Sequence, residues 1–350
     1  MRQPRQRWNR ETHPRHKMVL VCLAACCLLL PAAMPARARG QSANDPRWAI
    51  LVTGISGDPG LQKEYLKELV DLRNILEGPL GFPSDHVFAL FDDPKLDPAR
   101  IQHVSSRENL EKVCKEIASR ASREDTVFFF MEGHGDSDGK QYKFNLVGPD
   151  PTAVELAAML YAIPAQRYVI VNATNCSGGS LEVFAGRGKL VISATKSGTE
   201  KNLTHFGKYF IEALANNNAD VDKNSRVSIF EAFSYAARKV EEYYTKEGSM
   251  QTEHPMLNDN GDAQALALAD AGTHSALLSR AAFLDRGSPL LAQGDSSPET
   301  QALAKEAQSL ERQIELLKSA KDEMAEAEYM KKLEELLLKL AEVQARLRKK

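Results

Sequence analysis

The chain has 350 residues, of which 43% are hydrophobic and 26% charged, and its formal net charge at pH 7 is −2. This composition is typical of a globular protein that is long enough for one large domain or two small ones. The near-neutral charge and the absence of a basic patch interleaved with aromatic residues argue against nucleic acid as a partner.

Residues 1–38 are expected to be a secretory signal peptide. A basic start is followed by the apolar run Met18–Leu30, and Ala36-Arg37-Ala38 offers a small-x-small cleavage site. The apolar run is shorter than the roughly 18 to 20 residues of a membrane-spanning helix, so no membrane span is expected in the mature chain. The protein should therefore be exported, to the periplasm or out of the cell. A lipoprotein or membrane-anchored form is the weaker alternative.

Strand-like and helix-like segments alternate through the next two hundred residues. Apolar runs rich in β-branched and aromatic residues predict strands buried on both faces, and a 3.6-residue apolar period predicts helices. Strands are expected at 48–54, 86–91, 126–131, 168–171 and 190–195, and helices at 61–77, 106–121, 152–161, 205–215 and 228–244. A polar hairpin is expected around 140–148. The alternation predicts an α/β fold with a mainly parallel sheet covered by helices on both faces.

An acidic loop between the last two helices has the ligand spacing of an EF-hand calcium site. The candidate ligands occupy loop positions 1, 3, 5, 7, 9 and 12, which are Asp220, Asp222, Asn224, Arg226, Ser228 and Glu231. Ser225 stands at position 6, where glycine is usual, and this makes the turn harder to form. The alternative is that Ser228 and Glu231 only form a capping box for the following helix. Calcium is thus a possible ligand, and catalysis is expected to need no cofactor.

The C-terminal part of the chain changes composition twice. The first domain is expected to cover 46–262, and residues 263–299, rich in Ala, Ser and Gly, are expected to be a linker. In residues 300–350, leucines and other apolar residues recur at steps of three and four between charged residues. This pattern predicts a coiled coil or a helical hairpin, which could also make the protein a homo-oligomer.

Two of the apolar runs end in small polar loops, one carrying a histidine and the other a cysteine. His134 lies between two glycines, and Cys176 precedes Ser177-Gly178-Gly179. In open α/β sheets, ligands bind at the carboxyl ends of the strands. A thiolate there could act as a nucleophile, with histidine as the base that takes its proton. Each residue also has a purely structural interpretation, cysteine as a small buried hydrophobe and histidine as part of a turn.

The two loops together resemble the active-site sequences of the caspase/legumain clan of cysteine peptidases. The order Gly133-His134-Gly135 and then Asn175-Cys176-Ser177-Gly178-Gly179 carries the resemblance, which for the bacterial legumain-type branch covers about residues 48–211. It implies a caspase-like three-layer αβα sandwich. It also implies that His134 and Cys176 form a dyad, with Gly135 in the oxyanion hole.

The resemblance also implies where the substrate binds. The pocket would be built from the loop after the first strand and from the strand that follows the cysteine, at Gly54, Ser56, Ser193 and Thr195. The chain departs from the family before the cysteine, because Thr174-Asn175 stands where an acidic or Gln residue followed by Ala is usual.

The resulting hypothesis is an exported cysteine endopeptidase that acts on a peptide or protein substrate through a thioester intermediate. The alternative is a catalytically weak or inactive caspase-like scaffold that binds calcium and oligomerises through its C-terminal helices. A nucleotide-binding domain is the third interpretation, but the glycine-rich loop at 55–60 lacks the spacing and the lysine of a phosphate-binding loop.

Overall fold

The computed structural model describes residues 46–259, 261, 264–270, 276–285, 297–319 and 324–347. The predicted signal peptide lies outside these residues, so the expected export stays a prediction. Within the described ranges, no helix combines the length and the apolar character that a bilayer crossing requires.

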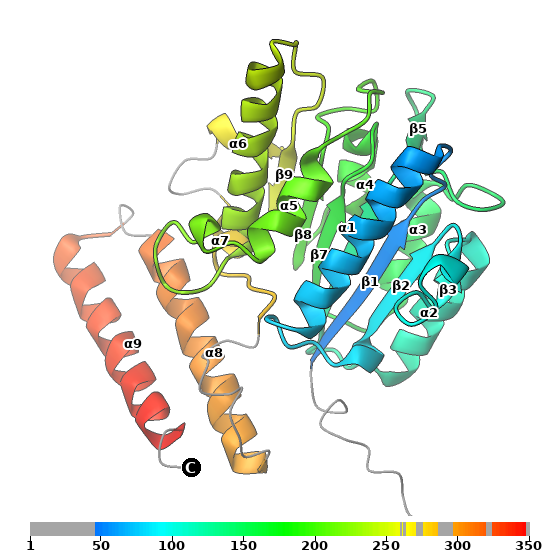
Figure 1. Ribbon diagram of the computed structural model, residues 1–350. Helices are drawn as coiled ribbons and strands as arrows, with labels where there is room; N and C mark the ends of the chain where they lie inside the picture. The colour runs from blue at the N-terminus through cyan, green and yellow to red at the C-terminus, as the bar shows by residue number, and fades with distance from the viewer. Residues whose placement is uncertain are drawn as a thin grey trace, which may run out of the picture. The chain divides into compact units, whose positions relative to one another are not determined.

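An eight-stranded sheet, in the order β10-β9-β8-β7-β4-β1-β2-β3, forms the centre of the structure (Figure 1). The six strands from β8 to β3 run parallel. These strands are β1 Arg47–Thr53, β2 Val87–Phe91, β3 His103–Val104, β4 Thr126–Glu132, β7 Arg167–Asn172 and β8 Lys189–Ser193. Almost every residue of the central strands is buried, as expected for continuous apolar runs covered on both faces.

Helices cover both faces of this sheet, and a separate hydrophobic core fills the space on each side. One core contains apolar residues of α1 Pro59–Glu77, α5 Phe206–Leu214 and α6 Ile229–Glu247. The other contains apolar residues of α2 Arg107–Arg120, α3 Ala153–Tyr161 and α4 Leu181–Phe184. The three-layer αβα fold class predicted from the sequence is thus confirmed.

Local sequence signals set several of the helix starts. Ser106 accepts a hydrogen bond from the Asn109 amide at the start of α2, and Thr152 and Glu155 form a capping box at the start of α3. Such side-chain caps stabilise a helix by about 1 kcal/mol each. The predicted polar hairpin also forms, but it begins earlier than expected, with β5 Gly135–Ser137 pairing antiparallel to β6 Tyr142–Phe144.

Regular structure continues from the end of the predicted domain into the described parts of the predicted linker, residues 263–299. β9 Met256–Asp259 pairs antiparallel to β8, and β10 Leu266–Ala267 pairs with β9. α7 Leu277–Arg280 follows, and the Asp259 carboxylate accepts hydrogen bonds from two amides at its start. The described parts of the predicted linker thus contain regular structure, and the domain boundaries stay a prediction. The strands are too short to show an alternating pattern; β9 is fixed by its pairing with β8, and β10 by its pairing with β9.

The C-terminal segment forms two helices, α8 Pro298–Ser319 and α9 Glu326–Leu347. They pack against each other through a small apolar cluster of Leu303, Ala307, Leu310, Val343 and Leu347. Of the two predicted arrangements, the described helices form the helical hairpin within one chain. Oligomerisation through them stays a prediction.

Candidate functional site

The strands that lead to His134 and Cys176 are neighbours in the sheet. β4 and β7 run parallel, with Met131 opposite Asn172. Their following loops lie side by side, because the amide of Gly135 donates a hydrogen bond of 2.8 Å to the Asn175 side-chain oxygen. The two polar loops that the sequence singled out therefore meet at the carboxyl edge of the parallel strands, where open α/β sheets bind ligands.

The His134 ring is held by groups from the first strand loop and from α1. Its Nε2 lies 3.3 Å from the carbonyl oxygen of Ser56, and the ring meets Tyr65 edge-on, with 6.3 Å between the ring centres. No hydrogen bond joins this ring to the Cys176 thiol in the part of the chain that the structure describes. A dyad contact would thus require the ring or the thiol to move, as active-site contacts of free enzymes often do.

Cys176 is completely buried and has a left-handed backbone, with φ of 58°. Its amide donates to the carbonyl oxygen of Glu200 at 2.8 Å. Burial raises the pKa of its thiol, and so does Asp136, while the nearby Lys201 and the Ser137 amide lower it. The net pKa lies above the usual value, so the thiol is protonated at neutral pH in this arrangement.

Gly135, the expected oxyanion-hole residue, sits where a side chain has no room. A Cβ there would come within 2.6 Å of the Asn175 backbone oxygen and 2.5 Å of the Tyr142 ring. Only glycine therefore allows these two loops to approach so closely. Its amide is already engaged by Asn175, so the described site is closed at this donor.

The four residues expected to build the substrate pocket flank the same edge of the sheet, but their polar groups form hydrogen bonds within the chain. The Gly54 amide donates to the Glu132 carbonyl at 2.8 Å, and the Ser56 amide donates to the Asp92 carboxylate at 3.2 Å. The Ser193 hydroxyl donates to the carbonyl of Thr195, whose own hydroxyl accepts from the Gly178 amide. Ser56, Ser193 and Thr195 are buried, so the described arrangement shows no open pocket lined by these side chains.

A buried pair of carboxyl groups lies beneath the histidine loop. Glu132 is the last residue of β4, two positions before His134, and its side chain shares a hydrogen bond with Glu68 of α1. Burial and the Glu68 charge raise the pKa of Glu132 well above its usual range. At least one of the two groups therefore keeps a proton at neutral pH. The sequence analysis missed this pair, because nothing in the spacing of two glutamates predicts that they meet.

A loop from the neighbouring strand covers Cys176. This β8–α5 loop, residues 194–205, holds Glu200, whose carboxylate accepts from the Lys196 amide at 2.9 Å and meets His254 Nδ1 at 2.5 Å. At the end of the loop, the buried Glu253 carboxylate accepts from the His205 amide and the Phe206 amide. Burial raises the pKa of Glu253 to about 7. Neither Glu200 nor Glu253 stood out in the sequence.

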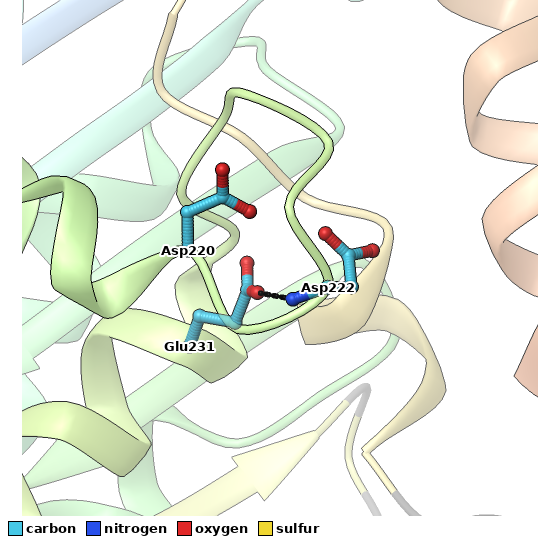
Figure 2. A group of neighbouring side chains, drawn as sticks. All are labelled: Asp220, Asp222 and Glu231. Atoms are coloured by element: carbon cyan, nitrogen blue, oxygen red, sulfur yellow. Dashed lines mark hydrogen bonds between the residues drawn. The ribbon is translucent and has the colours of Figure 1, made fainter.

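The acidic loop brings three of its predicted ligands together. Carboxylate oxygens of Asp220, Asp222 and Glu231 lie within 4.8 Å of one another, and Figure 2 shows the three side chains around one small space. Glu231 also accepts from the Asp222 amide and forms the predicted capping box with Ser228. The two interpretations are therefore compatible, because the glutamate caps α6 and faces the aspartates at once. Oxygen ligands of this kind are those that Ca²⁺ prefers.

The backbone of this loop takes the turn that the missing glycine would have eased. Ser225 has φ of 67°, a left-handed conformation that serine adopts only at a cost. Asn224 donates to Asp222 Oδ2. The side chain of Arg226 turns away to pair with Asp285 and with Glu311 of α8, so only its backbone carbonyl is left as a candidate ligand.

Comparisons with known proteins give distant structural similarities only. No protein-family model matches the chain, and no curated protein matches it. One similar solved structure is a protein from Geobacter sulfurreducens, with a TM-score of 0.40 and 10% identity over 62% of this chain and 94% of that one. Another is the Drosophila initiator caspase Dronc, with a TM-score of 0.39 and 15% identity over 64% of this chain and 84% of that one.

Proposed function

We propose that this chain is an exported cysteine endopeptidase that uses Cys176 as nucleophile and His134 as general base. The observation that carries the proposal is the direct pairing of β4 with β7, whose following loops contain these two residues and are joined by a hydrogen bond between Gly135 and Asn175. The resemblance of both loops to caspase/legumain sequences supports the same assignment.

In the proposed reaction, His134 takes the proton of the Cys176 thiol, and the sulfur attacks the carbonyl carbon of the scissile peptide bond. The carbonyl oxygen becomes an oxyanion that the amides of Gly135 and Cys176 would stabilise, by about 3 kcal/mol per donor by analogy with other acyl-transfer enzymes. The C–N bond then breaks as His134 returns the proton to the leaving amine. Water hydrolyses the remaining thioester and restores the thiol.

The two cysteines of the described chain supply a matched test. Cys176→Ala should abolish cleavage of a mixed peptide library, whereas Cys114→Ala, which changes the buried cysteine of α2, should leave the cleavage rate unchanged. Equal cleavage by the wild type and Cys176→Ala would remove Cys176 from the mechanism. Absence of cleavage by the wild type under all conditions would favour the alternative of a scaffold without turnover.

We also propose that the acidic loop binds calcium, which the three converging carboxylates support. A ligand that binds only the folded state raises the melting temperature. Calcium at millimolar concentration should therefore raise it relative to a chelator, and Asp222→Asn should reduce this shift. No shift in the wild type would exclude a calcium site in this range. An equally large calcium-induced shift in Asp222→Asn would mean that calcium binds to another part of the protein.

A further inference from the structure

The side chain of Asn175 connects the histidine loop, the cysteine loop and the β8–α5 loop. Its Oδ1 accepts from the Gly135 amide at 2.8 Å, and its Nδ2 donates to the Lys201 carbonyl at 2.9 Å. The same Nδ2 lies 3.8 Å from the Cys176 sulfur. Because an amide oxygen only accepts and an NH₂ group only donates, these partners fix one orientation of the carboxamide.

The Asn175 side-chain oxygen accepts the hydrogen bond of the Gly135 amide, which is one of the two proposed oxyanion donors. In the proposed reaction, the substrate carbonyl oxygen would take the Gly135 N–H bond that Asn175 now takes. The second proposed donor is filled as well, since the Cys176 amide donates to Glu200 in the β8–α5 loop. Both amides are thus satisfied within the chain, as buried amides generally are.

The same contacts hold the β8–α5 loop over the cysteine. Asn175 binds this loop at Lys201 and Cys176 binds it at Glu200, while the Glu200 carboxylate is braced by His254. The backbones are close here, because a Cβ on Gly178 would lie 2.2 Å from the Ser197 nitrogen. Cys176 is completely buried between this loop and the hydrophobic core on the α2, α3 and α4 side of the sheet, to which it belongs.

We propose that Asn175 is a positioning residue that keeps the resting site closed, by masking the Gly135 amide and clamping the β8–α5 loop over Cys176. Substrate binding requires the Asn175 side chain to rotate away, so that the carbonyl oxygen of the substrate replaces its Oδ1. The statement that substrate opens the site rests on the proposed peptidase function. The closed geometry itself can be tested without turnover.

The first measurement is amide hydrogen exchange in the folded, full-length protein. Asn175→Ala removes the acceptor of the Gly135 amide, so that amide should exchange at least about fivefold faster, the factor that an ordinary hydrogen bond contributes to an opening equilibrium. Asn216→Ala is the matched control, because this carboxamide also accepts from a backbone amide, that of Asn218, and donates to another group, Tyr235, but lies beyond the end of α5. Asn175→Asp keeps the acceptor and should leave the Gly135 exchange rate close to that of the wild type.

The second measurement is the rate at which iodoacetamide alkylates Cys176, mapped by mass spectrometry with Cys114 as internal reference. Asn175→Ala should raise this rate about fivefold or more by releasing the loop. Asn175→Asp keeps the acceptor of the Gly135 amide but loses the donor to the Lys201 carbonyl, so it should also raise this rate, though less than Asn175→Ala because a carboxylate near the sulfur raises the thiol pKa. A structural role alone would not speed alkylation in both variants while speeding Gly135 exchange only in Asn175→Ala. If Asn175→Ala fails to fold, Asn175→Ser, whose hydroxyl is too short to reach Gly135, carries the same test.

The outcomes separate this proposal from the peptidase function. Unchanged Gly135 exchange, or slower Cys176 alkylation, in Asn175→Ala would overturn the clamp whatever the protein catalyses. Faster exchange and faster alkylation would support it. If these rates rise but His134→Ala alters neither alkylation nor peptide cleavage, the clamp stands and the proposed dyad fails.

Discussion

Glu253 gives the stability of the folded chain a pH dependence whose sign and size follow from its position. The carboxyl group is fully buried at the start of α5, where it accepts from the amides of His205 and Phe206, and it also faces Tyr244 and Glu200. Burial is the largest effect on its pKa, which rises from 4.5 to about 7 in the fold. Between these two values, the folded state binds a proton that the unfolded state has lost.

The contribution to stability is therefore complete below pH 4.5 and is lost as the pH rises toward 7. A shift of this size corresponds to about 3 kcal/mol over the whole window, of which about 2.5 kcal/mol falls between pH 5 and pH 8. Glu253→Gln replaces the carboxyl with a neutral group of the same shape. The wild type loses this contribution as the pH rises from 5 to 8, and the variant does not. The free energy of unfolding of the variant minus that of the wild type should therefore increase by about 2 to 3 kcal/mol over this range.

Urea unfolding of both proteins at pH 5, 6, 7 and 8 measures this difference. Subtraction is needed because burial lowers the pKa of the neighbouring His205, which gives a trend of the opposite sign near pH 6. An exposed residue of α6 gives the matched control, Glu241→Gln, whose curve should run parallel to that of the wild type. Parallel curves for Glu253→Gln would refute the inference that burial, rather than the two amide donors, dominates the pKa of this group.

Three further predictions concern backbone and charge. Ser225→Gly should stabilise the calcium-free protein by up to about 1 kcal/mol in urea unfolding, because glycine adopts a left-handed backbone without strain; a loss would contradict this. Asp222→Asn should raise the melting temperature in chelator, since like charges within 4.8 Å of one another repel by about 1 kcal/mol per pair in water, and an unchanged value would refute the repulsion. Gly178→Ala should lower the free energy of unfolding by more than about 2 kcal/mol, because its Cβ would overlap the Ser197 backbone; normal stability would show that the loops separate freely.

The sequence predicted the parts of the fold that depend on local patterns. The apolar runs at 126–131 and 168–171 became central strands because a strand covered on both faces has little place for polar residues. The spacing of Asp220, Asp222 and Glu231 predicted a carboxylate cluster because the ligands of such a loop are close in sequence. β9 and β10 were not predicted, because their pairing depends on the edge of β8 rather than on a pattern of their own.

The location of the candidate site could be predicted from the sequence, but its closed arrangement could not. Polar residues after two buried strands located His134 and Cys176 at one edge of the sheet, since parallel strands end together. The contacts of the cysteine loop depend on a loop that returns from β8, and the Glu68–Glu132 pair depends on how α1 lies across β4. These are contacts between distant segments, which single-sequence patterns do not encode.

The contacts around Cys176 and the pKa of Glu253 belong to one structural unit. The β8–α5 loop is fixed to the cysteine loop through Asn175 and Glu200, and at its other end Glu253 binds the first amides of α5. Ionising Glu253 favours any conformation that exposes its carboxylate to water. The β8–α5 loop ends at His205, whose amide donates to this carboxylate. We therefore expect the cover over Cys176 to open more often above pH 7 than below it, so that alkalinity and loss of the Asn175 clamp should expose the same thiol.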